Sequence, residues 1–245
     1  MKQFSKWLAL LMAGLVLSAA LLSCDDGYDW SEEEDGDDDE EQSESSSQYK
    51  NLTPEELWDA ILEAKDFTIV MEGTRTGSNP TSIVTYTINK DGGKLMIAMK
   101  NQTDYTIHRK AYFDLENHLA YQEDDNGQWT YQEQEDLELD DLLDDLLPVD
   151  LLFEKSSYEE YDPENGIYVM KSREIAEEVA GDAGLTCQGE LKVQGSTYTF
   201  IYSAEEEPFK LEFTVTIEFQ SEIVKLPDAK PAENEGEAVP DIDEH

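Results

Sequence analysis

The stretch from Phe209 to Phe219 constrains the fold of this chain more than any other part of the sequence. Apolar and polar residues alternate along it, and one side carries Phe209, Leu211, Phe213, Val215, Ile217 and Phe219. Because successive side chains of a β-strand point to opposite faces, the pattern predicts a long strand with one apolar face. Such strands are typical of an antiparallel sheet that is covered on one side only.

Shorter alternating segments predict further strands. They lie at Phe67–Met71, Val84–Ile88, Leu95–Met99, Tyr105–Asp114, His118–Asp124, Gln128–Gln134, Leu191–Val193 and Tyr198–Tyr202. Turn signals at Asp91-Gly92-Gly93, Asn126-Gly127 and Gln194-Gly195 separate several of them. Consecutive hairpins favour an up-and-down antiparallel sheet.

Three segments have helical signals. Thr53-Pro54-Glu55-Glu56 is a capping box with proline in the first turn, so a helix is expected from Pro54 to Ala64. Between Glu135 and Leu147 the leucines recur with helical spacing, and Pro148 stops that helix. A third helix is expected from Arg173 to Ala180. The fold class is therefore α+β and mainly antiparallel β: a curved sheet, or half-barrel, wrapped around or covered by two to three helices.

The N-terminus has the pattern of a secretory signal. Lys2 and Lys6 precede an apolar run of Trp7–Leu22, which is short for a membrane span. The run ends in Leu21-Leu22-Ser23-Cys24, which resembles a lipobox. The resemblance implies cleavage after residue 23 and attachment of diacylglycerol and a further acyl chain such as palmitate to Cys24. We therefore expect an extracytoplasmic lipoprotein, anchored in the cell membrane or the outer membrane.

Acidic segments flank the folding domain. Residues 24–49, the lipid-bearing cysteine and its tether, and residues 227–245, the tail, lack apolar periodicity and are expected to be disordered. Residues 50–226 remain for a single domain. The aspartates directly after Cys24 can alternatively serve as a sorting signal, and the cluster of Asp and Glu residues in the tether can alternatively bind calcium weakly. The formal net charge of −41 at pH 7 argues against nucleic acid as a partner and against charge-driven binding to an anionic membrane. We expect a monomer held at the membrane covalently.

Catalytic and metal-binding motifs are missing from the sequence. His108, His118 and His245 have no metal-ligand spacing, and Cys187 has no activating partner in sequence. The segment Gln122–Glu133 partly imitates a calcium loop, but Gln122 stands where a carboxylate is needed and the flanks are strand-like. We expect neither an enzyme nor a cofactor or metal.

The order of elements resembles the lipoprotein-carrier superfamily of half-barrels, of the LolA, LolB and LppX type. The likeness rests on a signal, a short helix, long strands with Tyr-rich hairpins such as YFDLENHLAYQEDDNGQWTYQEQ, a central Leu-rich segment and the ending VTIEFQSEIVKLP. It covers about residues 50–226. It implies an incomplete barrel with an apolar cavity that takes lipid or acyl chains in the relatives. Unlike many carriers, this chain is expected to be anchored, which argues against shuttling.

Two functions follow as hypotheses. In the first, the protein binds a lipid or another apolar ligand in a cavity lined by Leu139, Leu142, Leu143, Leu146, Phe209, Leu211, Phe213, Val215 and Ile217. In the second, the protein is a cell-surface interaction or structural module with a filled core and no small ligand.

Overall fold

The computed structural model describes residues 48–76, 82–102, 106–123, 127–175, 185–206 and 209–232. The helices are α2 (Pro54–Glu63), α3 (Leu139–Asp144), α4 (Val149–Leu152) and the 3-10 helix η2 (Lys155–Ser157). The strands are β1 (Asp66–Thr76), β2 (Ser82–Asp91), β3 (Lys94–Gln102), β4 (Thr106–Asp114), β5 (Leu119–Glu123), β6 (Trp129–Glu133), β7 (Tyr158–Asp162), β8 (Ile167–Met170), β9 (Arg173–Ile175), β10 (Leu185–Gln194), β11 (Thr197–Glu206), β12 (Phe209–Glu218) and β13 (Lys230–Pro231).

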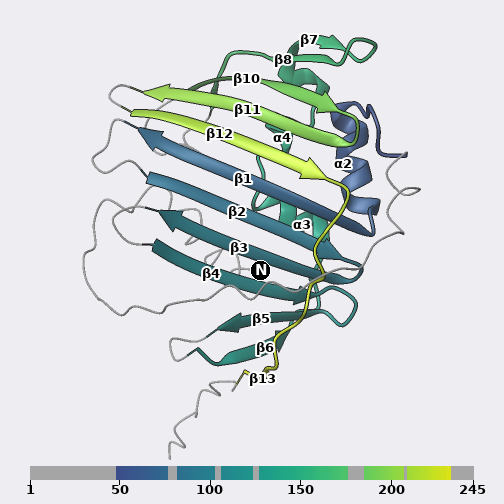
Figure 1. Cartoon of the computed structure of the whole chain (residues 1–245), viewed down its shortest axis with the longest axis vertical. Coiled ribbons are helices and arrows are strands. Elements are labelled where there is room, and N and C mark those ends of the chain that lie inside the picture. The colour runs from purple at the N-terminus through teal and green to yellow at the C-terminus, as the bar shows by residue number, and fades with distance from the viewer. Residues whose placement is uncertain are drawn as a thin grey trace, which may run out of the picture.

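One open sheet contains all the described strands. Their order is β13-β6-β5-β4-β3-β2-β1-β12-β11-β10-β8-β7, and β9 also pairs with β10. Most neighbours in the sheet are also neighbours in sequence, as expected for an up-and-down meander (Figure 1). The pairing of β1 with β12 joins the two halves of the chain. A mainly antiparallel α+β fold, predicted from the alternating pattern, is thereby confirmed.

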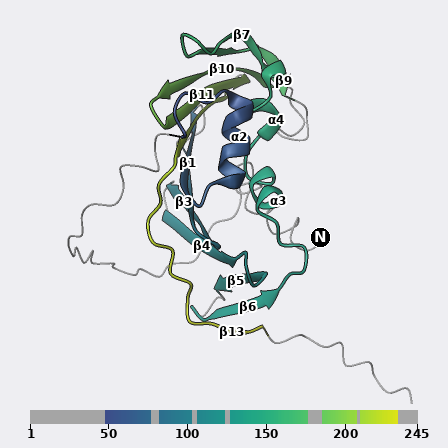
Figure 2. The ribbon, with the colours of Figure 1, turned by 90° about the vertical axis from the view of Figure 1, so that its right-hand side faces the viewer.

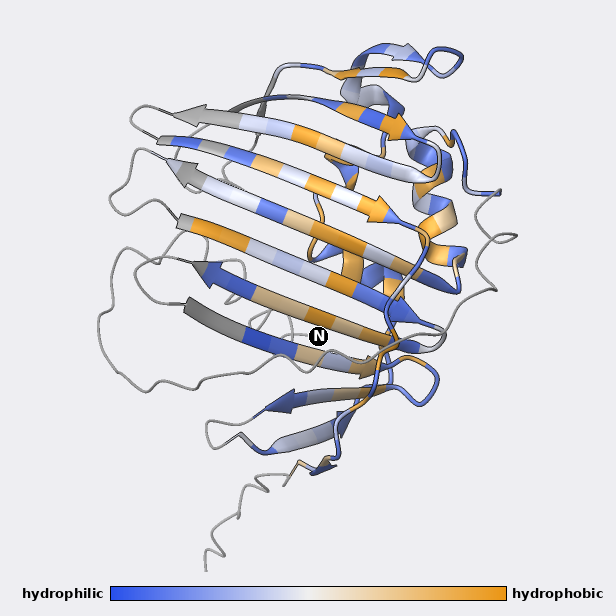
Figure 3. Ribbon diagram, in the orientation of Figure 1, coloured by the Kyte–Doolittle hydropathy of each residue, from blue (hydrophilic) through white to orange (hydrophobic). Residues whose placement is uncertain are grey.

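The apolar residues of the central strands meet in register on one face of the sheet. Ile69 of β1 lies opposite Ile88 of β2 and Ile217 of β12, and all three side chains are fully buried. On β12, Val215 is also buried whereas Glu212 is exposed, which confirms the predicted alternation there. Hydrophobic residues recur along the central strands and on the helices behind them (Figure 3). The three α-helices in the described ranges lie on the same side of the sheet (Figure 2).

Helix α2 is fixed at both ends. The predicted capping box is present: Glu56 N donates to Thr53 Oγ1, and Thr53 N donates to Glu56 Oε2 at 2.9 Å. At the other end, the Lys90 ammonium of β2 donates to the Ala64 and Lys65 carbonyls at 2.6 and 3.0 Å. A cation suits this end because it faces the negative pole of the helix dipole. Burial lowers the pKa of Lys90, and the nearby Asp66 charge opposes that shift.

Two helix predictions need correction. The Leu-rich helix ends at Asp144, short of Leu147, and a second short helix, α4, follows Pro148. The helix predicted from Arg173 to Ala180 is wrong for its first three residues, which form β9. These residues pair with residues 185–187 of β10. Backbone hydrogen bonds to that strand thus take the place of the hydrogen bonds within a helix. Residues 176–180 lie outside the described part of the chain.

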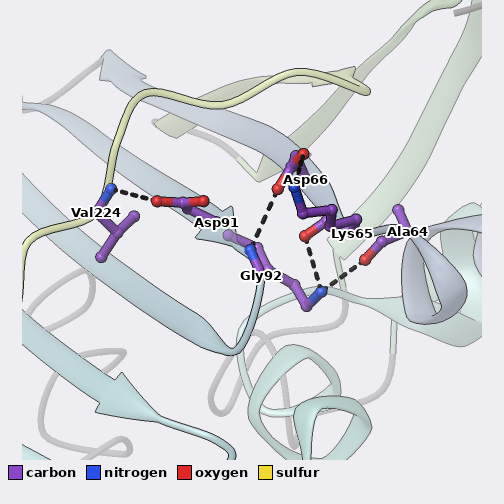
Figure 4. Close-up of polar contacts among 7 residues, drawn as sticks. Ala64, Lys65, Asp66, Asp91, Gly92 and Val224 are labelled. Carbon is purple, nitrogen blue, oxygen red and sulfur yellow. Dashed lines mark hydrogen bonds and ion pairs between the residues drawn. The ribbon is translucent and has the colours of Figure 1, made fainter. Parts of the chain in front are cut away.

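A C-terminal strap, defined as residues 219–232, follows β12 along the face of the sheet opposite the helices (Figures 1 and 2). Its first ring, Phe219, stacks on Tyr49 with a centroid distance of 3.9 Å. Val224 is buried, and its N–H donates to Asp91 Oδ2 at 3.1 Å (Figure 4). The strap ends beside β6, where Lys230 and Pro231 form β13 in parallel pairing. Residues 227–232 of the segment predicted as a tail are thus described, whereas residues 233–245 are not.

Gly189 on β10 tests how tightly the sheet is packed. A Cβ added there would lie 2.4 Å from the Ile201 carbonyl oxygen and 2.7 Å from Tyr202 Cβ. Because backbone cannot move aside cheaply, we expect Gly189→Ala to lower the free energy of unfolding by about 1–3 kcal/mol in urea titrations. Gly93→Ala is the matched control: the three atoms nearest its added Cβ all belong to the exposed and flexible Glu116 side chain, so a change within about 0.5 kcal/mol is expected. Equal losses in the two variants would contradict this account.

Candidate functional site

The apolar face of the sheet is covered by α2 and by an insertion segment, defined as residues 135–157, which contains α3, α4 and η2. The insertion segment buries a run of large apolar side chains: Leu137, Leu142, Leu143, Leu146, Leu147, Leu151, Leu152 and Phe153. They belong to the same core cluster as the buried residues of the central strands. The sheet and the insertion segment therefore form the two walls of any site on this face.

Packing between these walls is close in the part that the structure describes. Leu143 of the insertion segment and Val215 and Ile217 of β12 have no solvent-accessible surface. A void large enough for water would give its lining residues some accessible surface, so no such void adjoins these three side chains. The Phe153 ring of the insertion segment contacts rings of both α2 and the sheet. Its centroid lies 5.1 Å from that of Trp58 of α2 and 5.4 Å from that of Phe200 of β11.

The insertion segment is built differently from α2. Its α-helices span six and four residues, and neither has a side-chain cap at its N-terminus. Helices this short are not stable in water alone, so their structure depends on the apolar contacts with the sheet. Polar contacts tie the C-terminal end of the segment to the β7–β8 hairpin. The Tyr158 hydroxyl donates to the Leu152 carbonyl, and Lys171 N donates to the Ser157 carbonyl at 2.8 Å.

Negative charge is concentrated on the outer side of the insertion segment. Residues 135–157 carry nine carboxylates and one lysine. Burial raises the pKa of the Asp145 carboxyl, and the charges of Asp144 and Asp141 act in the same direction. Mutual repulsion therefore opposes the compact form of the segment, while the leucines stabilise it.

One row across the same face combines small residues with two aromatic rings. Five positions lie opposite one another in this row, one on each strand from β3 to β11: Asn101, Val84, Gly73, Phe213 and Tyr202. The Phe213 and Tyr202 rings stack with a centroid distance of 5.0 Å, and a Cβ added to Gly73 would lie 3.0 Å from the Phe213 ring. Phe213 is half-buried.

Asn101 stands out in this row because it is polar and only 6% exposed. Its Oδ1 atom has no hydrogen-bond partner within the described part of the protein. A buried acceptor without a partner lowers the stability of the fold, so such atoms are uncommon in native proteins. The atom can accept a hydrogen bond from a bound molecule that places an N–H or O–H group on this face.

The predicted cavity residues fall into three groups. Leu142, Leu143 and Leu146 of the insertion segment and Val215 and Ile217 of β12 are buried in one core cluster, and Leu139 and Phe213 are partly buried against that cluster. The Phe209 and Leu211 side chains and the whole of Cys24 lie outside the described residues. Phe153, Phe200 and Asn101 were not among the predicted cavity residues. The alternation of β11 could have indicated Phe200, but no sequence signal marks an unpaired amide.

The aromatic, histidine and cysteine side chains are not gathered into one site within the described part of the chain. Trp58 is partly buried and packs against the core, whereas Tyr112 of β4 and Trp129 of β6 contact each other in a T-shaped pair. His118 is exposed in the turn before β5. The side chains of His108 and Cys187 lie outside the described residues. Within the described ranges, no group of three or more His, Cys, Asp or Glu residues could hold a metal ion.

No protein-family model matches this chain, and no curated protein does either. Among the helices that the structure describes, none is long and apolar enough to span a membrane.

Two asparagines on neighbouring strands test the state of Asn101. Asn89 is 4% exposed, and its Oδ1 accepts a hydrogen bond of 2.7 Å from Thr68 Oγ1. We expect Asn89→Leu to lower the free energy of unfolding by about 1 kcal/mol, and Asn101→Leu to leave it unchanged or raise it by about 1 kcal/mol. Thermal and urea unfolding of both variants measure the difference. A loss at Asn101 as large as that at Asn89 would show that Oδ1 has a partner, such as a bound water.

Proposed function

We propose that this protein is a membrane-anchored extracytoplasmic lipoprotein without enzymatic activity, whose half-barrel binds a lipid or another apolar ligand. The proposed half-barrel is the described sheet, with its two ends bent toward the helices. Figure 2 supports this shape, because β7–β10 and β5–β6 lie on either side of α2 and α3. The anchor is the proposed lipid on Cys24, and the acidic tether holds the domain away from the membrane surface.

One observation carries the ligand proposal: the insertion segment covers the apolar face with leucines on short, uncapped helices. These leucines occupy the surface that an acyl chain would use, so ligand and insertion segment compete for the same face. Burial of apolar area stabilises either arrangement, at roughly 25 cal/mol per Å². Replacement of the insertion segment by an apolar ligand therefore changes the free energy of the protein little. The insertion segment then serves as a lid, and the closed form is the one described here.

Charge favours this exchange. When the lid opens, its nine carboxylates move apart from one another and from the domain, which reduces their repulsion. The Asn101 amide and the Phe213 ring lie at the border of the filled region, where an entering ligand would first meet the sheet. A ligand with an apolar chain and one hydrogen-bond donor suits this combination.

A second candidate function is favoured by the close packing itself. Leu143, Val215 and Ile217 leave no water-sized void beside them, as expected of an interaction module with a permanently filled core. The two candidates differ in what happens when the lid is weakened. A lid that competes with a ligand gives way to it, whereas a permanent core only loses stability.

Leu146→Ala in the lid separates these candidates. Truncation of a buried leucine costs about 2–5 kcal/mol. We expect about 1.4 kcal/mol of that energy to hold the lid closed. Because about 1.4 kcal/mol corresponds to a tenfold change in affinity, the variant should bind the apolar dye N-phenyl-1-naphthylamine roughly tenfold more tightly than the parent chain. Dye fluorescence and native mass spectrometry of the mature chain measure binding and bound lipid.

Leu57→Ala on α2 is the matched control, since Leu57 is equally buried but lies on the capped helix. We expect it to lower the free energy of unfolding without tightening dye binding. If neither the parent chain nor Leu146→Ala binds the dye, and both variants lose stability equally, the filled-core module is the correct interpretation.

The anchor has a separate test. Cys24→Ser removes the thiol that the lipobox resemblance assigns to diacylglycerol. We expect the variant to lose metabolic labelling with radioactive palmitate and to move from the detergent phase to the aqueous phase in Triton X-114 partitioning, since attached acyl chains provide the membrane affinity. Cys187→Ser is the control and keeps both properties. Unchanged labelling of Cys24→Ser would contradict the proposed anchor.

A further inference from the structure

The two edges of the sheet are protected in different ways. β7, at one edge, has three carboxylates among its five residues, and its register with β8 is irregular between Tyr158 and Glu160. Charge and irregularity both discourage a further strand from pairing with an edge. β6, toward the other edge, reads Trp-Thr-Tyr-Gln-Glu, so its first four residues are uncharged and contain two aromatic rings. The sequence of β6 contains neither protective device in those four positions.

The strap covers this edge in place of such devices. Only two of its residues, Lys230 and Pro231, are in register with Thr130 and Tyr131 of β6. The next residue, Ala232, donates its N–H to the Tyr131 carbonyl at 2.8 Å. The strap is also held upstream, by buried Val224 and its bond to Asp91. The pairing of β13 with β6 can therefore open while the upstream part of the strap, around Val224, stays in place.

The backbone of β6 shows what the strap covers. Gln134 N donates to the His118 carbonyl, on the β5 side, whereas the Tyr131 carbonyl accepts from the strap. Because backbone groups alternate in direction along an antiparallel strand, Trp129, Tyr131 and Glu133 direct their N–H and C=O groups away from β5. A five-residue antiparallel partner centred on Tyr131 would form about six hydrogen bonds with these groups.

We propose that β6 is a strand-pairing site for a second copy of this chain, and that β13 of the strap blocks it. With β13 released, β6 pairs with β6 of the second copy around a two-fold axis through Tyr131. Such an interface is self-complementary: Trp129 of one copy lies opposite Glu133 of the other. The carboxylates of the two Glu133 residues are thereby kept apart. The result is one sheet that continues across both copies. The proposal does not depend on ligand binding at the sheet face that the helices cover.

Deletion of residues 228–245 from the full chain tests the proposal, since it removes β13 but retains Val224 and its contact. Sedimentation velocity of the mature protein in detergent is expected to show a concentration-dependent dimer for this variant and a monomer for the parent chain. Ala232→Pro is a second variant that removes the N–H donated to Tyr131 and keeps the charge of the tail. We expect it to raise the dimer fraction at least threefold over that of the parent chain. Far-UV circular dichroism establishes that both variants are folded.

Two controls distinguish edge pairing from other causes. Deletion of residues 233–245 removes the acidic end of the tail and retains β13, so it is expected to remain a monomer. Tyr131→Pro in the chain lacking residues 228–245 removes the outward N–H at the centre of the interface and is expected to restore the monomer. The proposal is overturned if deletion of residues 228–245 leaves a folded monomer. It is also overturned if deletion of residues 233–245 dimerises equally, or if Tyr131→Pro leaves the dimer intact.

Discussion

Burial of a single apolar sheet face is the constraint on which the rest of this structure depends. That face is assembled from both ends of the domain, because β1 pairs with β12 and places Ile69 beside Ile217. Neither strand can bury its apolar side chains within its own hairpin. The face therefore needs a cover, and the chain supplies one from the helix that precedes β1 and another from the insertion between β6 and β7. The opposite face is polar and needs no continuous cover, so the strap crosses it as a single extended segment.

The two covers are stabilised by different means, and this difference is the basis of the proposed function. Helix α2 has a capping box at its start and the Lys90 ammonium at its end, so its position is determined by directed polar contacts as well as by Leu57 and Ile61. The Tyr161 hydroxyl adds a bond of 2.6 Å to Glu55, and burial together with that bond raises the pKa of Tyr161 to about 12. Apart from the hydrogen bonds at its C-terminal end, the insertion segment relies on leucines beneath a layer of carboxylates. Apolar contact is non-directional, so another apolar molecule can replace it.

Predictions from sequence succeeded where a local pattern determined the structure and failed where a distant partner did. The alternation of β12, the capping box of α2 and the turn at Gly92 depend on neighbouring residues alone, and each was predicted. The strand at Arg173–Ile175 forms because residues 185–187 are available to pair with it, which no local pattern reveals. The pairing of β13 with β6 joins residues about a hundred positions apart, in a segment whose composition is that of a disordered tail. The same holds for the site: periodicity indicated its leucines and Val215, but the unpaired amide of Asn101 depends on what the fold places around it.

The edges of the sheet connect the fold with the proposed anchor. A soluble chain with a net charge of −41 is kept dispersed by repulsion between molecules, which makes edge protection less necessary. Lipidation of Cys24 would confine the molecules to a surface, where their effective concentration is higher. Repulsion between molecules is also largely screened beyond about 8 Å at physiological ionic strength. A strand such as β6, whose first four residues are uncharged, is then the most exposed to unwanted pairing. A membrane-bound form of this chain therefore requires a segment that covers this edge, because charge repulsion between the molecules cannot protect it.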